Sequence, residues 1–112
     1  MVIYMDSLES LVDKTEGFVW DRWNIDKNFH KHNVHPFECE EVFFNEPIFE
    51  KLPFRAEQGE DRFYAVGESN SGRALTVVFT IRHGRIRVVS PRDSSRKERR
   101  QRHEKIKKNP QL

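Results

Sequence analysis

Signatures of several common protein classes are absent from this chain of 112 residues. Its one cysteine, Cys39, cannot form an internal disulfide, and no Cys and His residues have zinc-site spacing. Its five glycines form no phosphate-binding loop, and the sequence contains no nucleophile motif. These absences argue against a disulfide-stapled scaffold, a zinc module and a nucleotide-triphosphate enzyme, and we expect neither a metal nor a cofactor.

Long hydrophobic runs are also missing. No stretch approaches the roughly 20 apolar residues of a membrane helix. The segment before Phe18 is acidic and lacks the basic start and apolar run of a signal peptide. Together with the single cysteine, these features predict a cytoplasmic protein without membrane association. The nine Phe, two Trp and two Tyr residues supply enough large apolar side chains for one modest core.

Charge is distributed very unevenly along the chain. Twelve of the 20 lysines and arginines lie between Arg82 and Lys108, where three acidic residues oppose them, so this segment carries 12 − 3 = +9. The remaining 8 basic and 15 acidic residues sum to −7. A basic segment of this kind attracts polyanions through phosphate contacts and counterion release, although basic C-termini are often only solvated. Nucleic acid is the first partner that the charge pattern indicates.

Local patterns predict an α+β fold. Asp21 is a suitable N-cap for a helix that extends to His32, and Asn33 suits a left-handed stop. Pro36 fits the first turn of a second helix, and Ser95 with Glu98 forms a capping box for a basic helix that ends near Lys108. The pattern also predicts a short helix at residues 7–12 and an aromatic strand at 18–20. It predicts an antiparallel meander of four strands at 48–52, 62–67, 74–82 and 85–90.

The two-residue turn at His83-Gly84 fixes the register of one hairpin. It places Arg82 opposite Arg85, and Thr80 opposite Arg87, on the face away from the core. Arginines directly across a ladder repel unless an anion lies between them. Internal carboxylates, Glu60 among them, or an external phosphate satisfy this requirement equally well.

Glu60 lies two residues before Arg62, the first residue of a predicted strand, so the two side chains share one side of the chain. An internal ion pair is the simplest role for them. The alternative is chemical, because a general base beside cations that stabilise a phosphorane is the minimum for metal-free RNA cleavage. The histidines around Lys31 lie at a helix end without ligands at useful spacing, so a metal site is not predicted there.

An ordered set of segments from Phe18 to Arg102 resembles the BrnT family of type II toxins. The segments are FVWD at 18–21, Asn28 with KHNV at 31–34, EEVF at 40–43, EDRF at 60–63, Gly72-Arg73, IRVVSPR at 86–92 and Glu98. The resemblance implies a small RelE-like α+β domain with an antiparallel sheet, two N-terminal helices and a basic C-terminal helix. It places a toxin domain at residues 18–108, between an N-terminal extension at 1–17 and a tail at 109–112.

The same resemblance implies an endoribonuclease that arrests translation and is neutralised by a BrnA-like antitoxin, either as a homodimer or as a heterotetramer with that antitoxin. The absence of metal-ligand spacing predicts that its cleavage is metal-independent. The implied catalytic residues are Glu60, Arg62, Arg87 and Arg92. The implied RNA-binding residues are Lys31, Arg82, Arg85 and Arg96.

Three positions depart from the family pattern: Asn33 replaces a glycine, Pro91 replaces an alanine, and Arg102 replaces a common tyrosine. The last change leaves open a catalytically inactive homologue that binds only RNA or an antitoxin. A housekeeping RNA-binding module is disfavoured, because such modules interleave aromatic and basic residues on an open sheet.

Overall fold

A computed structural model describes residues 8–53 and 59–108. Its elements, in chain order, are α1 (Leu8–Asp13), β1 (Phe18–Val19), α2 (Arg22–His32), α3 (Pro36–Phe44), β2 (Ile48–Lys51), β3 (Phe63–Glu68), β4 (Ala74–Arg82), β5 (Arg85–Asp93) and α4 (Arg96–Lys108). The strands form one sheet in the order β1-β5-β4-β3-β2. The α+β class is therefore confirmed, whereas the expected tail at 109–112 lies outside the described residues.

The sheet is mixed, and in this respect the prediction of an antiparallel sheet was wrong. Strands β2 to β5 form the expected antiparallel meander. Strand β1, however, pairs in parallel with β5, with Phe18 opposite Ile86 and Val19 opposite Arg87. A pairing of two residues across more than 60 positions of sequence leaves no local signal. It brings the start of α2 beside the basic hairpin.

Both predicted ends of α2 and the predicted start of α3 are confirmed. Asp21 accepts a hydrogen bond of 2.7 Å from the backbone N–H of Asn24 and so caps α2. Asn33 closes that helix in the left-handed conformation, with φ of 55°. Pro36 begins α3, as expected. These local rules set the position of the first turn of α2, which lines the candidate site described below.

Strand β5 extends to Asp93, three residues beyond the predicted end, and it includes Pro91. A bulge next to Val78 and Phe79 shifts the register, after which Pro91 pairs with Val77. Strand β1 pairs with β5 only as far as Arg87. Pro91 therefore occupies the part of the β5 edge that no described strand covers, where its missing N–H interrupts no ladder.

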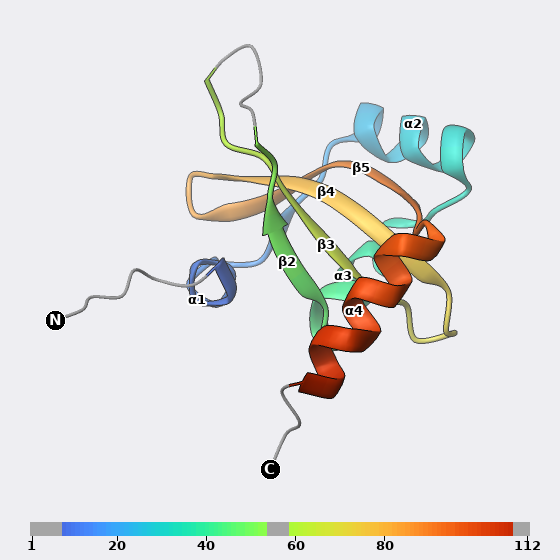
Figure 1. The fold of residues 1–112 in the computed structure, drawn as a ribbon. Coiled ribbons are helices and arrows are strands. Elements are labelled where there is room, and N and C mark those ends of the chain that lie inside the picture. The colour runs from blue at the N-terminus through green and yellow to red at the C-terminus, as the bar shows by residue number, and fades with distance from the viewer. Residues whose placement is uncertain (1–7, 54–58, 109–112) are drawn as a thin grey trace, which may run out of the picture.

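The core lies between the sheet and α3, whereas α4 crosses the opposite face of the sheet (Figure 1). Phe79, Ile86 and Val88 are buried on the core face, as the hairpin register predicted. Val42 and Cys39 of α3 pack against them. The Phe43 ring contacts the Phe79 ring edge-on, with the two ring centroids 5.0 Å apart. No helix in the described part of the chain is long and apolar enough to cross a membrane.

Helix α4 is held on the sheet mainly by polar contacts. Glu98 pairs with Arg92 of β5, from which it accepts two hydrogen bonds of 2.8 Å, and not with Arg102, its i,i+4 neighbour on the helix. Arg102 instead donates to the carbonyl of Asn45 at 2.9 Å and lies 3.6 Å from Glu68. A helix with one apolar residue is thus fixed by tertiary ion pairs.

Candidate active site

A basic pocket lies where the first turns of α2, the segment before β3 and the hairpin of β4 and β5 meet. Its volume is about 310 Å³. The lining residues are Trp23, Asn24, Lys27, Glu60, Arg62, Thr80, Arg82, Arg87 and Val89. Four basic side chains and one carboxylate give the lining a formal charge of 4 − 1 = +3. A partly enclosed cavity of this charge suits a phosphate group.

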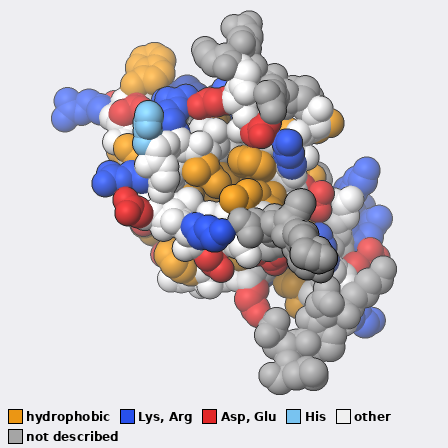
Figure 2. Space-filling view, turned by 90° about the vertical axis from the view of Figure 1, so that its left-hand side faces the viewer, with side chains coloured by type: hydrophobic (Ala, Val, Ile, Leu, Met, Phe, Trp, Pro, Cys, Tyr) orange, Lys and Arg blue, Asp and Glu red, His pale blue; other side chains and the backbone are white. Residues whose placement is uncertain are grey.

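Two of the hairpin arginines have internal carboxylate partners. Arg82 donates to Glu60 at 2.7 Å, and Arg87 donates to Asp21 at 2.6 Å. The internal-carboxylate interpretation is therefore confirmed for both side chains. On the face of the molecule turned to the viewer in Figure 2, blue basic and red acidic side chains likewise lie next to one another. The strong charge asymmetry of the sequence is thus partly neutralised by folding.

The hydrogen bond from Arg82 has a chemical consequence for Glu60. It lowers the pKa of this carboxyl group below its usual value, and the nearby charges of Arg62 and Arg87 act in the same direction. Glu60 is therefore ionised at neutral pH, the state in which a carboxylate can accept a proton. It is the one acidic side chain in the pocket lining.

Arg62 differs from the other arginines in the pocket. Its Nε atom is buried and has no hydrogen-bond partner among the described residues. An unsatisfied buried donor on a charged group is costly, so such a group is retained only if something compensates for it. Arg62 also lines the pocket, so an anion that enters there would be attracted by the positive charge of its guanidinium.

Arg92, predicted as a catalytic residue, does not line this pocket. It is committed to Glu98, whose pKa the two hydrogen bonds from Arg92 lower to about 2, with further help from the Ser95 backbone and Thr76. The structure thus brings together Glu60, Arg62 and Arg87 from the predicted catalytic group, with Arg82 from the predicted RNA-binding group. Lys31, Arg85 and Arg96 are exposed and lie outside the lining.

Three residues near the pocket were missed by the sequence interpretation. Asp21 was predicted only as a helix cap, yet the same carboxylate pairs with Arg87. Trp23 and Lys27 stand four residues apart on α2 and both line the pocket. Their i,i+4 spacing after a capping residue was a usable signal for a shared helix face. What the sequence did not reveal is that this face borders the hairpin.

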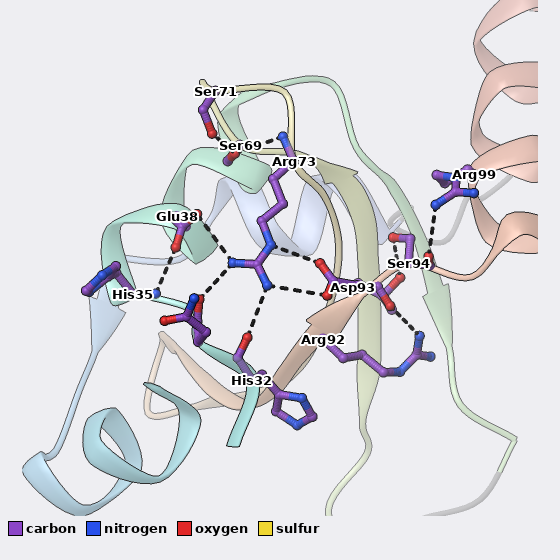
Figure 3. A network of polar contacts seen from close by, with 12 residues as sticks. His32, His35, Glu38, Ser69, Ser71, Arg73, Arg92, Asp93, Ser94 and Arg99 are labelled. Carbon is purple, nitrogen blue, oxygen red and sulfur yellow. Dashed lines mark hydrogen bonds and ion pairs between the residues drawn. The ribbon is translucent and has the colours of Figure 1, made fainter. Parts of the chain in front are cut away.

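A second polar network, centred on Arg73, joins the end of α2 to β5 (Figure 3). The Arg73 guanidinium donates to Asp93 at 2.9 Å and to the carbonyls of Asn33 and His32 at 2.7 and 3.1 Å. It satisfies carbonyls at the helix end and contacts no group of the pocket lining. No cluster of three metal-binding side chains occurs within residues 8–53 and 59–108.

Comparison with known proteins identifies a protein family and a similar solved structure. The family model described as the ribonuclease toxin BrnT of type II toxin–antitoxin systems matches residues 20–98. The crystal structure of the Brucella abortus ribonuclease toxin BrnT is similar in fold, with a TM-score of 0.55 and 25% identity, covering 73% of this chain and 100% of that one. No curated protein matches the sequence.

The family match spans both strands of the basic hairpin, the first turns of α2 and the Arg92–Glu98 pair, so every residue that lines the pocket lies within it. It covers well over half of the chain. The chain therefore belongs to the BrnT family of ribonuclease toxins of type II toxin–antitoxin systems.

Proposed function

We propose that this toxin is an endoribonuclease that cleaves RNA in the basic pocket without a metal ion. The observation that carries the proposal is the meeting, in one cavity, of a single ionised carboxylate, Glu60, with Arg62, Arg82 and Arg87. A base and several cationic donors are the groups that cleavage by a neighbouring ribose hydroxyl requires.

In the proposed reaction, Glu60 accepts the proton of a ribose 2′-hydroxyl as its oxygen bonds to the adjacent phosphorus. The bond from phosphorus to the 5′-oxygen breaks, and the leaving oxygen takes a proton from water. Arg62 and Arg87 stabilise the charge that develops on the phosphorane oxygens. The products are a 2′,3′-cyclic phosphate and a 5′-hydroxyl.

Arg82 has a switching role in this proposal. A phosphate in the pocket competes with Glu60 for the Arg82 guanidinium, because both are anions that prefer its forked donors. Loss of the Arg82 hydrogen bond raises the pKa of Glu60, since that bond is the main cause of the lowered value. Substrate binding thereby makes Glu60 a stronger base.

Incubation of RNA with the toxin in excess EDTA tests the proposal. Cleavage should continue at an unchanged rate, and end-group analysis should find cyclic phosphates and 5′-hydroxyls. Activity that vanishes in EDTA and returns with Mg²⁺, or products with 5′-phosphates, would rule out the proposed chemistry.

We further propose that RNA cleavage arrests translation and that an acidic segment of a BrnA-like antitoxin neutralises the toxin by covering the pocket and α4. The family is one of toxins with cognate antitoxins, and complementary charge favours docking of an acidic segment on this surface. We propose that the toxin assembles either as a homodimer or as a heterotetramer with the antitoxin. Hydrogen-exchange protection confined to residues 1–17 on complex formation would contradict this placement.

No observation favours the inactive homologue. Arg102, which replaces the common tyrosine, bonds to the backbone after α3 and lies outside the pocket lining. Its substitution therefore leaves the proposed catalytic groups in place.

A further inference from the structure

Trp23 is an unusual surface residue. Its side chain is 76% exposed, although tryptophan is highly buried on average. A single exposed apolar residue is in itself unremarkable. Trp23, however, borders the same pocket as Arg62, Arg82 and Arg87, so its indole ring lies beside a concentration of positive charge.

The backbone that carries Trp23 is held firmly against the sheet. Asp21 caps the first turn of α2 and pairs with Arg87. The buried side chain of Asn24 donates a hydrogen bond to the carbonyl of Val88. Residues on both sides of Trp23 thus anchor it to β5, the strand that contributes Arg87. A contact made by the indole ring needs little further ordering of the helix, which favours affinity.

An exposed aromatic ring beside a cationic groove is the arrangement with which proteins bind single-stranded nucleic acids. The cations hold the phosphates, and the ring stacks on an unpaired base. Lys27, one helical turn after Trp23, adds a cation on the same side of α2. We propose that Trp23 is the stacking platform for a nucleobase next to the phosphate in the pocket, and so contributes to the choice of cleavage site.

This inference rests on one part of the proposed function, namely that an RNA phosphate occupies the pocket. It assigns no chemical step to Trp23, which acts through binding. Because stacking uses the face of a base, the platform accepts every base, and it favours purines, whose faces are larger. The expected specificity is therefore for unpaired purine positions rather than for one sequence.

Binding of a 2′-O-methyl RNA oligonucleotide, in which the attacking hydroxyl is blocked, tests the platform without cleavage. Trp23→Ala should raise Kd about 10-fold, whereas Trp23→Phe should retain most of the affinity. Phe44→Ala is the matched control, because Phe44 is 78% exposed on α3 and lies outside the pocket lining. In a Trp20→Phe background, binding should quench the fluorescence of Trp23, then the only tryptophan.

An abasic deoxyribose-phosphate oligomer separates stacking from charge. It should bind the wild type and Trp23→Ala equally, because it has no base to stack. Equal affinity of the wild type and Trp23→Ala for the 2′-O-methyl RNA would overturn the inference. So would a loss of affinity for the abasic oligomer in Trp23→Ala that is as large as its loss for the 2′-O-methyl RNA. Wild-type protein that binds the blocked RNA but fails to cleave unmodified RNA would count against the proposed function and leave the stacking result standing.

Discussion

The contact between Glu98 and Arg92 allows a quantitative prediction about how α4 is attached. Glu98 is 14% exposed at the side chain and accepts two hydrogen bonds of 2.8 Å from Arg92. These bonds, together with those from the Ser95 backbone and Thr76, lower its pKa from 4.5 to about 2. A carboxyl group with a lowered folded-state pKa stabilises the fold above its unfolded pKa, and this stability is lost as the pH falls from about 4.5 to about 2.

The pKa values give the size of the effect. The difference between 4.5 and about 2 corresponds to roughly 3 kcal/mol of stability at pH 7, of which about 1.5 kcal/mol remains at pH 3. Glu98→Gln retains a side chain that can complete the capping box with Ser95, and it removes the charge that faces Arg92. We therefore expect it to destabilise the protein by about 2–3 kcal/mol at pH 7.

Urea unfolding monitored by tryptophan fluorescence at pH 7 and pH 3 measures this difference. The gap between wild type and Glu98→Gln should shrink by about half on acidification. Glu104→Gln is the matched control on the same helix, since Glu104 is exposed, and it should change stability by less than about 0.5 kcal/mol. A gap that stays constant between the two pH values would refute the charge-based account of this contact.

Three further outcomes test other contacts. Asp21→Ala should cost about 1 kcal/mol more stability than Asp21→Asn in urea unfolding, because asparagine still caps α2; equal losses would remove the cap argument. Gly67→Ala should lower stability by about 1–2 kcal/mol in the same assay, since the added Cβ would lie 3.1 Å from Val42 and 3.2 Å from Pro47; an unchanged midpoint would mean that this packing can relax. Burial raises the pKa of the Cys39 thiol to about 12, so iodoacetamide should label the protein at pH 8 only in concentrated urea, and rapid labelling of the folded protein would contradict that burial.

The features that the sequence predicted correctly are those set by neighbouring residues. The His83-Gly84 turn has positive φ at both residues, 53° and 76°, and it imposes the expected pairing of Thr80 with Arg87. The caps at Asp21 and Asn33 are equally local. Turn and cap geometry depends on a few adjacent side chains, so a single sequence is enough to identify it.

Contacts between distant segments could not be predicted in this way. The pair of Asp21 and Arg87 joins residues 66 positions apart, and it depends on the parallel pairing of a two-residue strand. Glu98 precedes Arg102 by four residues on the same helix, yet it pairs with Arg92, because the position of α4 on the sheet decides the partner. Charge complementarity shows that such pairs will form, but only the tertiary arrangement selects the partners.

The central claim is that the pocket bordered by α2 and the hairpin is where RNA is cleaved. Its most direct test is the single-turnover rate at saturating RNA in EDTA for Arg62→Ala and Arg85→Ala, with folding verified for both. Arg62 lines the pocket, whereas Arg85 is exposed in the same hairpin and lies outside the lining. We predict that Arg62→Ala slows cleavage by about 10²–10³ and that Arg85→Ala changes the rate only slightly. A near-normal rate for Arg62→Ala, or a larger loss for Arg85→Ala, would contradict the assignment of this pocket as the active site.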